Sequence, residues 1–178
     1  LVQRSAALSG WSVERVARGI DGALALLFDP RTELGGGLRR ALPESTGLTG
    51  PVIEWGIEAA FGAAGRDSML RSVRMVEASD ERGYAPPRLT VVVLSGNLFT
   101  APLRAVAIPL LVRSPVLAKA SSADGVLPRF LKKALRESDP ELAAFYEVVE
   151  FARDEPDLGA ALFSCAEAVS VFGDDETV

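Results

Sequence analysis

The stretch LTVVVLSGNLFTAPLRAVAIPLLVRSPVLAKASS, residues 89–122, decides the fold of this chain. Its first six residues are an unbroken, Val-rich apolar run, which is typical of a strand that is covered on both faces in a parallel sheet. Ser95-Gly96-Asn97 ends that run, a helix-length segment follows, and residues 116–119 are expected to form a second short strand. The order therefore predicts a strand, a crossover helix and a parallel strand.

The chain after this unit continues the same alternation. Residues 147–151 and 168–172 are predicted to be the third and fourth strands, and helical spacing of apolar residues precedes each of them. Four strands separated by helices predict an α/β parallel sheet with right-handed crossovers, which is the Rossmann-like class.

The first half of the chain is predicted to be mostly helical. Residues 11–28 have helical spacing, with Ser12 as the N-cap, and further helices are expected over 49–65 and 68–75. Residues 31–42 contain three consecutive glycines, each of which costs up to ~1 kcal/mol relative to Ala in a helix, so we expect two short pieces with a soft join.

A charged loop that ends in Pro86-Pro87 marks the boundary between the two patterns. We therefore expect a helical N-terminal segment, 1–85, that packs on a Rossmann-like segment, 86–178. The chain starts without Met, and its last five residues look like the first turn of an unfinished helix. We accordingly expect a piece of a longer protein, with the second segment truncated at its C-terminal end.

The composition excludes several classes of function. A net charge of -5, from 24 acidic and 19 basic residues, gives no electrostatic footprint for nucleic acid. The longest apolar segment is far shorter than the ~20 residues of a membrane span, and no signal peptide opens the chain. With one Cys and no His, neither a disulfide nor an ordinary metal site is expected, and the cytosol is the expected compartment.

Three polar clusters follow predicted strands: Ser95-Gly96-Asn97, residues 119–122 and Gly173-Asp174. The carboxyl ends of parallel strands face the ligand crevice, where helix N-termini offer N–H groups to phosphate, so this pattern suits a dinucleotide. The alternative is that turns favour these residue types in any protein, and that Lys119 only extends its ammonium group from a strand end into water. Neither a GxGxxG fingerprint nor a P-loop follows a strand.

Other reactive or charged side chains are expected to be structural. Cys165 ends the helix before the fourth strand among apolar neighbours, so we expect a buried, inert thiol. Glu147 and Glu150 are predicted to form a solvated face, and residues 132–133 with Arg136 are predicted to form the exposed side of their helix.

The strings LSGN, KASS, DPELAA and VSVFGDDETV, in this order, resemble the bacterial fatty acyl-CoA reductases of the LuxC type, which belong to the aldehyde dehydrogenase superfamily. The stretch TGLTGPVIEWGIEAAF in the first half resembles the segment before their cofactor domain. Nearly the whole chain is covered, as the N-terminal portion of such a reductase. The resemblance implies NADPH-dependent reduction of a fatty acyl-CoA to the aldehyde through an acyl-cysteine, with the nucleophile beyond Val178.

The resemblance also implies roles for individual residues. Asn97 corresponds to the Asn whose amide stabilises the oxyanion of the thiohemiacetal. Lys119, with Ser121 beside it, corresponds to the Lys that contacts the adenosine ribose hydroxyls or a 2′-phosphate. Ser122 stands where many NAD-using relatives have a Glu, and the loss of that carboxylate favours NADPH over NADH.

Gly173-Asp174 corresponds to the turn at the helix that meets the pyrophosphate, although an acidic residue is unfavourable beside phosphate. The chain also departs from the family where Leu98 replaces a Pro and where residues 151–153 replace a Trp-Pro-Gly-like stretch. These departures leave two alternatives open: a degenerate, non-catalytic nucleotide- or partner-binding domain of the same fold, and an α/β domain for an unrelated small ligand. For the reductase, one expected partner is the acyl thioester substrate. The other is further copies of the protein, which would associate through regions absent from this chain.

Overall fold

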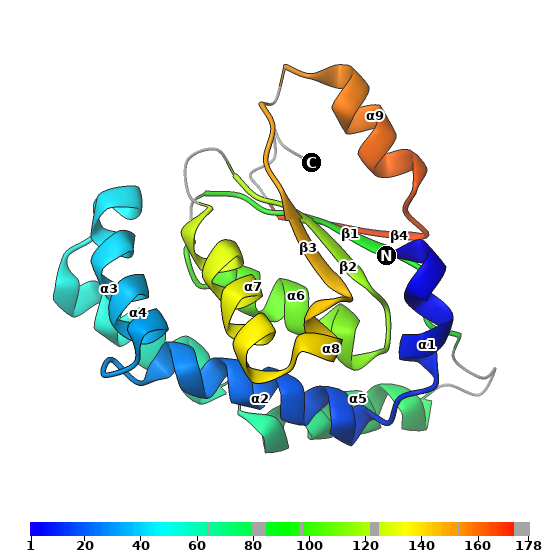
Figure 1. Cartoon of the computed structure of the whole chain (residues 1–178), viewed down its shortest axis with the longest axis horizontal. Helices are drawn as coiled ribbons and strands as arrows, with labels where there is room; N and C mark the ends of the chain where they lie inside the picture. Colours follow the sequence, from blue (N-terminus) through cyan, green and yellow to red (C-terminus); the bar gives the residue numbers. More distant parts are fainter. Residues whose placement is uncertain (64, 80–84, 97, 122–124, 153, 173–178) are drawn as a thin grey trace.

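A computed structural model describes residues 1–63, 65–79, 85–96, 98–121, 125–152 and 154–172 of the chain. Figure 1 shows a parallel sheet with α6, α7 and α8 on one side and α9 on the other. The described helices are η1 (Val2–Arg4), α1 (Ser5–Ser9), α2 (Val13–Phe28), α3 (Glu33–Thr46), α4 (Gly50–Ala63), α5 (Arg66–Ser79), α6 (Ala101–Leu111), α7 (Val126–Ser138), α8 (Pro140–Ala143) and α9 (Pro156–Ser164).

The sheet contains β1 (Thr90–Val93), β2 (Val116–Lys119), β3 (Tyr146–Val149) and β4 (Ala168–Val171), in the order β3-β2-β1-β4. Every pairing is parallel, so the predicted Rossmann-like α/β class is confirmed. The third strand is displaced from its predicted position, 147–151. It ends at Val149, whose carbonyl accepts the hydrogen bond from Ala120 N at 2.9 Å, and the chain then leaves the ladder.

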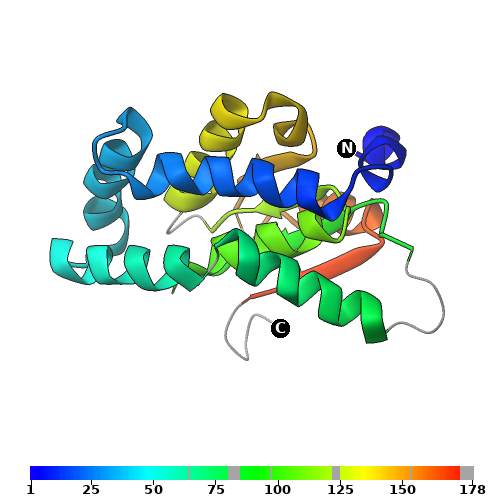
Figure 2. The same cartoon turned by 90° about the horizontal axis from the view of Figure 1, so that it is seen from below.

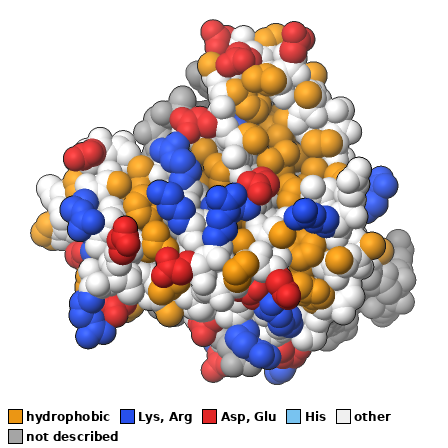
Figure 3. Space-filling view, in the orientation of Figure 1, with side chains coloured by type: hydrophobic (Ala, Val, Ile, Leu, Met, Phe, Trp, Pro, Cys, Tyr) orange, Lys and Arg blue, Asp and Glu red, His pale blue; other side chains and the backbone are white. Residues whose placement is uncertain are grey.

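The two faces of the sheet are covered to different extents. Val92, Val116, Ala118 and Tyr146 are fully buried in the main core, which the sheet shares with α6 and α7. On the opposite face, a smaller buried cluster of Leu89, Val91 and Leu162 joins the sheet to α9. The rest of this face is only partly covered, and in Figure 3 hydrophobic side chains are visible over α9 and the adjoining strands.

Helix α2 begins where the sequence predicts. The Ser12 side chain accepts a hydrogen bond from Arg15 N at 3.2 Å, which confirms it as the N-cap. Val16, Ile20 and Leu27 point into the core from one face of the helix. In Figure 2, α2 runs beside α5, and both helices also contact α6, so the helical half and the sheet half share one core.

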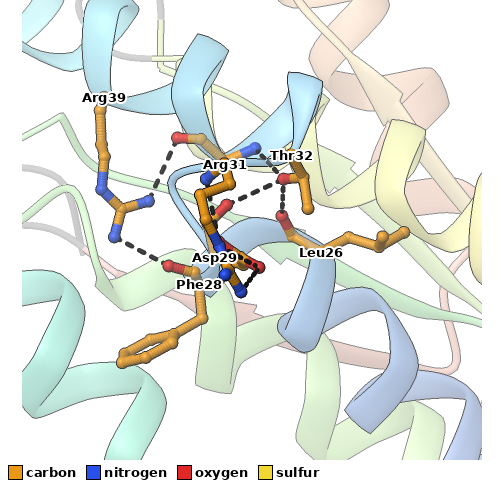
Figure 4. A network of polar contacts seen from close by, with 7 residues as sticks. Leu26, Phe28, Asp29, Arg31, Thr32 and Arg39 are labelled. Carbon is orange, nitrogen blue, oxygen red and sulfur yellow. Dashed lines mark hydrogen bonds and ion pairs between the residues drawn. The ribbon is translucent and has the colours of Figure 1, made fainter.

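The prediction of two short pieces around the three glycines was wrong, because α3 is one continuous helix. Thr32 Oγ1 caps it by accepting from Gly35 N at 2.9 Å and donates to Leu26 O at 2.5 Å (Figure 4). A Cβ at Gly35 would lie 2.1 Å from Asp29 O, so this close approach requires glycine. Burial of Leu38 and Leu42 outweighs the low helix propensity, and α3 ends at Gly47, whose φ is 70°.

Candidate functional site at the carboxyl edge of the sheet

The carboxyl ends of the four strands lie in one row. The register pairs Val93 with Lys119 and with Val171, and it pairs Lys119 with Val149. The ladder continues one step further, since Leu94 N donates to Lys119 O at 3.0 Å and Phe172 N donates to Val93 O at 2.9 Å. The segments that follow the strands therefore start side by side at this edge, as in the ligand crevices of open α/β sheets.

Two of the predicted site residues, Lys119 and Ser121, lie in the described part of this edge, and both are half-buried. Lys119 is the last residue of β2, and Ser121 follows it by two positions. Asn97, Ser122, Gly173 and Asp174 lie outside the described residues, so their predicted roles are not tested by the structure.

An aromatic ring lies beneath the Lys119 ammonium group. Lys119 Nζ is 5.0 Å from the centroid of the half-buried Phe151 ring, which is within the range of a cation–π contact. Phe151 comes two residues after β3 and packs against the smaller apolar cluster on the α9 side of the sheet. In the sequence, this residue stands out only as a departure from the family, and its predicted place as the last residue of the third strand, 147–151, was the available signal.

The acidic side chains next to this edge are paired with cations of α7. Glu147 Oε1 accepts from Lys132 Nζ at 2.7 Å, and Glu150 forms an ion pair with Arg129. The prediction that Lys132 faces water was wrong. It is 7% exposed, because its ammonium also donates to the carbonyls of Ala143 and Tyr146. Burial lowers the pKa of Lys132, and the Glu147 carboxylate partly opposes that shift.

A mostly apolar pocket of about 530 Å³ adjoins the end of β1. One wall comes from α3 and α4, and the other comes from the segment that joins β1 to α6 and from the start of α6. Trp55, with 72% of its surface exposed, borders the pocket, as do Leu98 and the exposed Arg104. Gly96, three residues after the end of β1, also lines it, so the pocket extends to the polar edge of the sheet.

Arg39 connects the helices on which one pocket wall is built. Its guanidinium donates to Phe28 O at 2.9 Å at the end of α2 (Figure 4). It also donates to Leu27 O at 3.0 Å. It also pairs with Glu54 of α4 at 2.8 Å, although the side chain itself is only 14% exposed. This network fixes α4 relative to α2 and α3, and therefore the wall that carries Trp55.

The prediction that Cys165 is buried was also wrong. It is exposed, not buried, and its thiol donates to Leu162 O at 2.9 Å. The thiol is accessible because the end of α9 lies outside the main core, and of that helix only Leu162 is buried. Cys165 precedes β4, as predicted, and so lies at the amino edge of the sheet, opposite the row that contains Lys119.

Two further properties follow from the described coordinates. Within the residues that the structure describes, no three His, Cys, Asp or Glu side chains converge as they would around a metal ion. Of the helices in the described part of the chain, none combines the length and apolarity that a membrane crossing requires.

Comparison with protein families gives one match. A family model described as acyl-CoA reductase (LuxC) matches residues 57–178. This range contains the whole sheet, α6 to α9 and the pocket wall on the side of β1 and α6. Of the α4 residues that line the pocket, it includes Ala59 and Ala60. No curated protein sequence matches the chain.

Several solved structures are similar in fold. They include a NAD-dependent benzaldehyde dehydrogenase from Corynebacterium glutamicum, with a TM-score of 0.66, 14% identity, and coverage of 96% of this chain and 44% of that chain. HpcC from Thermus thermophilus has a TM-score of 0.72, 14% identity, and coverage of 94% and 33%. Glyceraldehyde-3-phosphate dehydrogenase GapN from Methanocaldococcus jannaschii, complexed with NADP, has a TM-score of 0.63, 10% identity, and coverage of 95% and 43%.

This chain spans less than half the length of each of these three proteins. At such identities the likeness concerns the fold alone: the sheet and its helices are arranged as in these three proteins.

Proposed function

The chain belongs to the acyl-CoA reductase (LuxC) family, and from this premise we propose that its protein reduces a fatty acyl thioester to the aldehyde with a nicotinamide cofactor. The observation that carries the proposal is the junction between the apolar pocket and the polar edge of the sheet at Gly96. An acyl chain in the pocket would direct its thioester carbon toward the end of β1. The next residue in the sequence is Asn97, the proposed oxyanion donor.

In the proposed reaction, a cysteine thiolate attacks the thioester carbonyl carbon, and the C–S bond to CoA breaks. CoA leaves as a thiolate that takes up a proton, and an acyl-cysteine remains. A bound nicotinamide cofactor would supply the hydride that the acyl carbon accepts. The bond to the cysteine sulfur then breaks, which releases the aldehyde and restores the thiolate. The Asn97 amide N–H would stabilise the negative charge on the carbonyl oxygen at each addition.

We propose that the nucleophilic cysteine comes from outside these 178 residues. Cys165 is the only cysteine in the sequence, and it lies at the edge of the sheet opposite the strand ends that adjoin the pocket. A strand rises about 3.3 Å per residue, so a four-residue strand separates its two ends by about 10 Å. That separation argues against Cys165 as the acyl acceptor.

For the cofactor, we propose NADPH rather than NADH. The ammonium of Lys119 and the hydroxyls of Ser121 and Ser122 would contact the adenosine ribose and its 2′-phosphate, and the Gly173-Asp174 turn would meet the pyrophosphate. The fit is supported by the charge at the edge: no acidic partner of Lys119 is recorded in the described coordinates, whereas Glu147 and Glu150 are already paired with cations. A 2′-phosphate would therefore meet a cation that no carboxylate of the described residues neutralises.

In this proposal, the two segments of the chain, 1–85 and 86–178, each contribute to the substrate site. Residues 1–85 would supply one wall of the acyl pocket, through α3 and α4, and residues 86–178 would supply the other wall and the cofactor edge. The acyl thioester would thus bind where the two segments meet.

The test uses the complete gene product with NADPH and a series of acyl-CoA thioesters of increasing chain length. We expect NADPH oxidation, with one CoA thiol released for each aldehyde trapped. Trp55→Ala should raise KM for long acyl chains more than for short ones, because it removes an apolar pocket wall. Met75→Ala is the matched control, since Met75 is similarly exposed, at 74%, but lies away from the pocket.

Two outcomes would contradict parts of the proposal. Cofactor binding without reduction of any acyl-CoA would favour the alternative of a non-catalytic nucleotide-binding protein. Equal affinities for NADPH and NADH in a fluorescence titration, or a preference for NADH, would overturn the argument from Ser122.

A further inference from the structure

We infer that Phe151 is a positioning residue for the Lys119 ammonium, and that it holds this charge at the carboxyl edge without neutralising it. The inference rests on the proposed function, because it concerns the nucleotide that this edge would bind. It adds to the nucleotide site a residue that follows β3, and the role of this residue is to hold Lys119 and not to contact the nucleotide.

Lys119 and Phe151 lie next to each other at the carboxyl edge of the sheet. Lys119 and Val149 are register partners on β2 and β3, and Phe151 follows Val149 by two residues. Side chains alternate across a strand, so Lys119 lies on the same face as Leu117, and this is the face that the α9 cluster only partly covers. The ring and the ammonium therefore meet at the carboxyl edge of that face, 5.0 Å apart.

The cation–π contact with Phe151 orders the Lys119 side chain and leaves its charge available. A lysine side chain is long and has many rotamers, so a ligand that must order it loses affinity. A carboxylate would order the side chain but would also neutralise its charge and occupy its donors. An aromatic face attracts the ammonium through its quadrupole and leaves N–H donors available for phosphate or hydroxyl oxygens.

A comparison within the chain supports this distinction. Lys132, one helix away, is held by Glu147 and by two backbone carbonyls, which is the arrangement of a buried structural lysine. Lys119 is only half-buried, and its recorded partner in the described part of the chain is the Phe151 ring. The two lysines lie near the same strand, but only Lys119 is arranged to receive an anionic or hydroxyl-bearing ligand.

The experiment measures the dissociation constants of NADPH and NADH for the complete gene product, from the change in cofactor fluorescence. Phe151→Leu keeps an apolar side chain but removes the quadrupole, and it should weaken NADPH binding about two- to fivefold, which corresponds to the usual strength of an exposed cation–π contact. Phe151→Tyr and Phe151→Trp should bind like the wild type. A role in packing alone would not predict this pattern, since Trp is larger than Phe.

Phe130→Leu is the matched control, because Phe130 lies 5.2 Å from Lys133 Nζ in a second cation–π pair, on α7. It should leave both dissociation constants unchanged, and thermal unfolding of each variant checks that it is folded. If Phe151→Leu binds NADPH like the wild type while Lys119→Ala binds it weakly, the positioning role is wrong and the cofactor site stands. If the wild type binds neither NADPH nor NADH, the proposed cofactor site itself fails.

Discussion

The ring of Phe99 lies directly over Gly56, so closely that a Cβ at Gly56 would stand 2.6 Å from Phe99 Cζ. Both residues line the pocket, one from α4 and the other from the segment between β1 and α6. The absence of a side chain at position 56 thus allows the ring to be buried, at 7% exposure, where the two pocket walls meet.

Gly56→Ala is expected to destabilise the protein and to change the pocket. The added methyl group must displace the Phe99 ring or α4, and such overpacking costs about 1–3 kcal/mol. Gly50→Ala, in the same helix, is the control, because no atom lies within 4 Å of a Cβ there. Urea unfolding measures both, and equal stability of the two variants would show that the contact does not constrain the pocket wall.

Arg39→Met is expected to lower the free energy of unfolding by about 1–3 kcal/mol, because it leaves carbonyl groups at the end of α2 without their charged donor. Met preserves much of the apolar stem, so the loss reports on the guanidinium. Arg31→Met is the control: it breaks the ion pair with Asp29, but Arg31 is 88% exposed and its loss should matter far less. Similar losses in both variants would contradict the assigned role of Arg39.

The fold followed from local patterns, whereas several details depended on contacts that a local pattern does not contain. The Val-rich runs and their spacing predicted the parallel sheet, since a strand buried on both faces has a distinctive composition. The three glycines of α3 misled the prediction, because the burial of Leu38 and Leu42 that outweighs their low helix propensity depends on tertiary packing. Lys132 misled it for the same reason: its two carbonyl partners lie 11 and 14 residues further along the chain.

From the sequence, the candidate site could be predicted only as the carboxyl edge of the sheet. Lys119 was predicted at the end of a strand, and it is there. Phe151 and the two pocket walls, which carry Trp55 and Phe99, come from segments whose proximity depends on the strand order and on the packing of α4. Periodicity gives neither of these, so the sequence alone could not show that an apolar pocket adjoins the strand ends.

Asp139 should make the protein sensitive to acid. Burial raises the pKa of Asp139, but hydrogen bonds from Arg15 and from Leu142 N lower it more, so the pKa lies below its ordinary value of 3.8. Because the folded-state pKa is depressed, the stabilisation is present above pH 3.8 and is lost as the pH falls through the folded-state value.

Asp139→Asn should be less stable than the wild type at neutral pH and should lose less further stability below pH 3.8. Denaturant midpoints measured over a pH series would show this difference in slope. Glu141→Gln is the control, because Glu141 also contacts Arg15 but is 77% exposed. An acid slope in Asp139→Asn equal to that of the wild type would remove Asp139 as the cause.

Lys132 should make the protein more stable as the pH rises in the alkaline range. Burial lowers its pKa below 10.5, so the cost of burying the charge is present below the folded-state pKa and is relieved as the pH rises toward 10.5. Lys132→Met should be less stable at neutral pH, because the Ala143 and Tyr146 carbonyls lose their donor, and it should lack this rise. Lys133→Met, on the exposed side of α7, should retain the rise, and its absence from the wild type would contradict the shift.

Cys165→Ser is expected to leave acyl-CoA reduction by the complete gene product within about twofold of the wild type, as for a residue that does not contact the transition state. The exposed Cys165 thiol should nevertheless react readily with an alkylating reagent in the folded protein. These two expectations distinguish an accessible Cys165 thiol from a catalytic one.

If the nucleophile lies elsewhere, alkylation should inactivate Cys165→Ser as fast as it inactivates the wild type. If instead the variant is inactive, or resists inactivation while retaining activity, the acyl acceptor is not where we propose. An inactive variant would place the chemistry at the amino edge of β4, and the argument from the opposite edge would have to be abandoned.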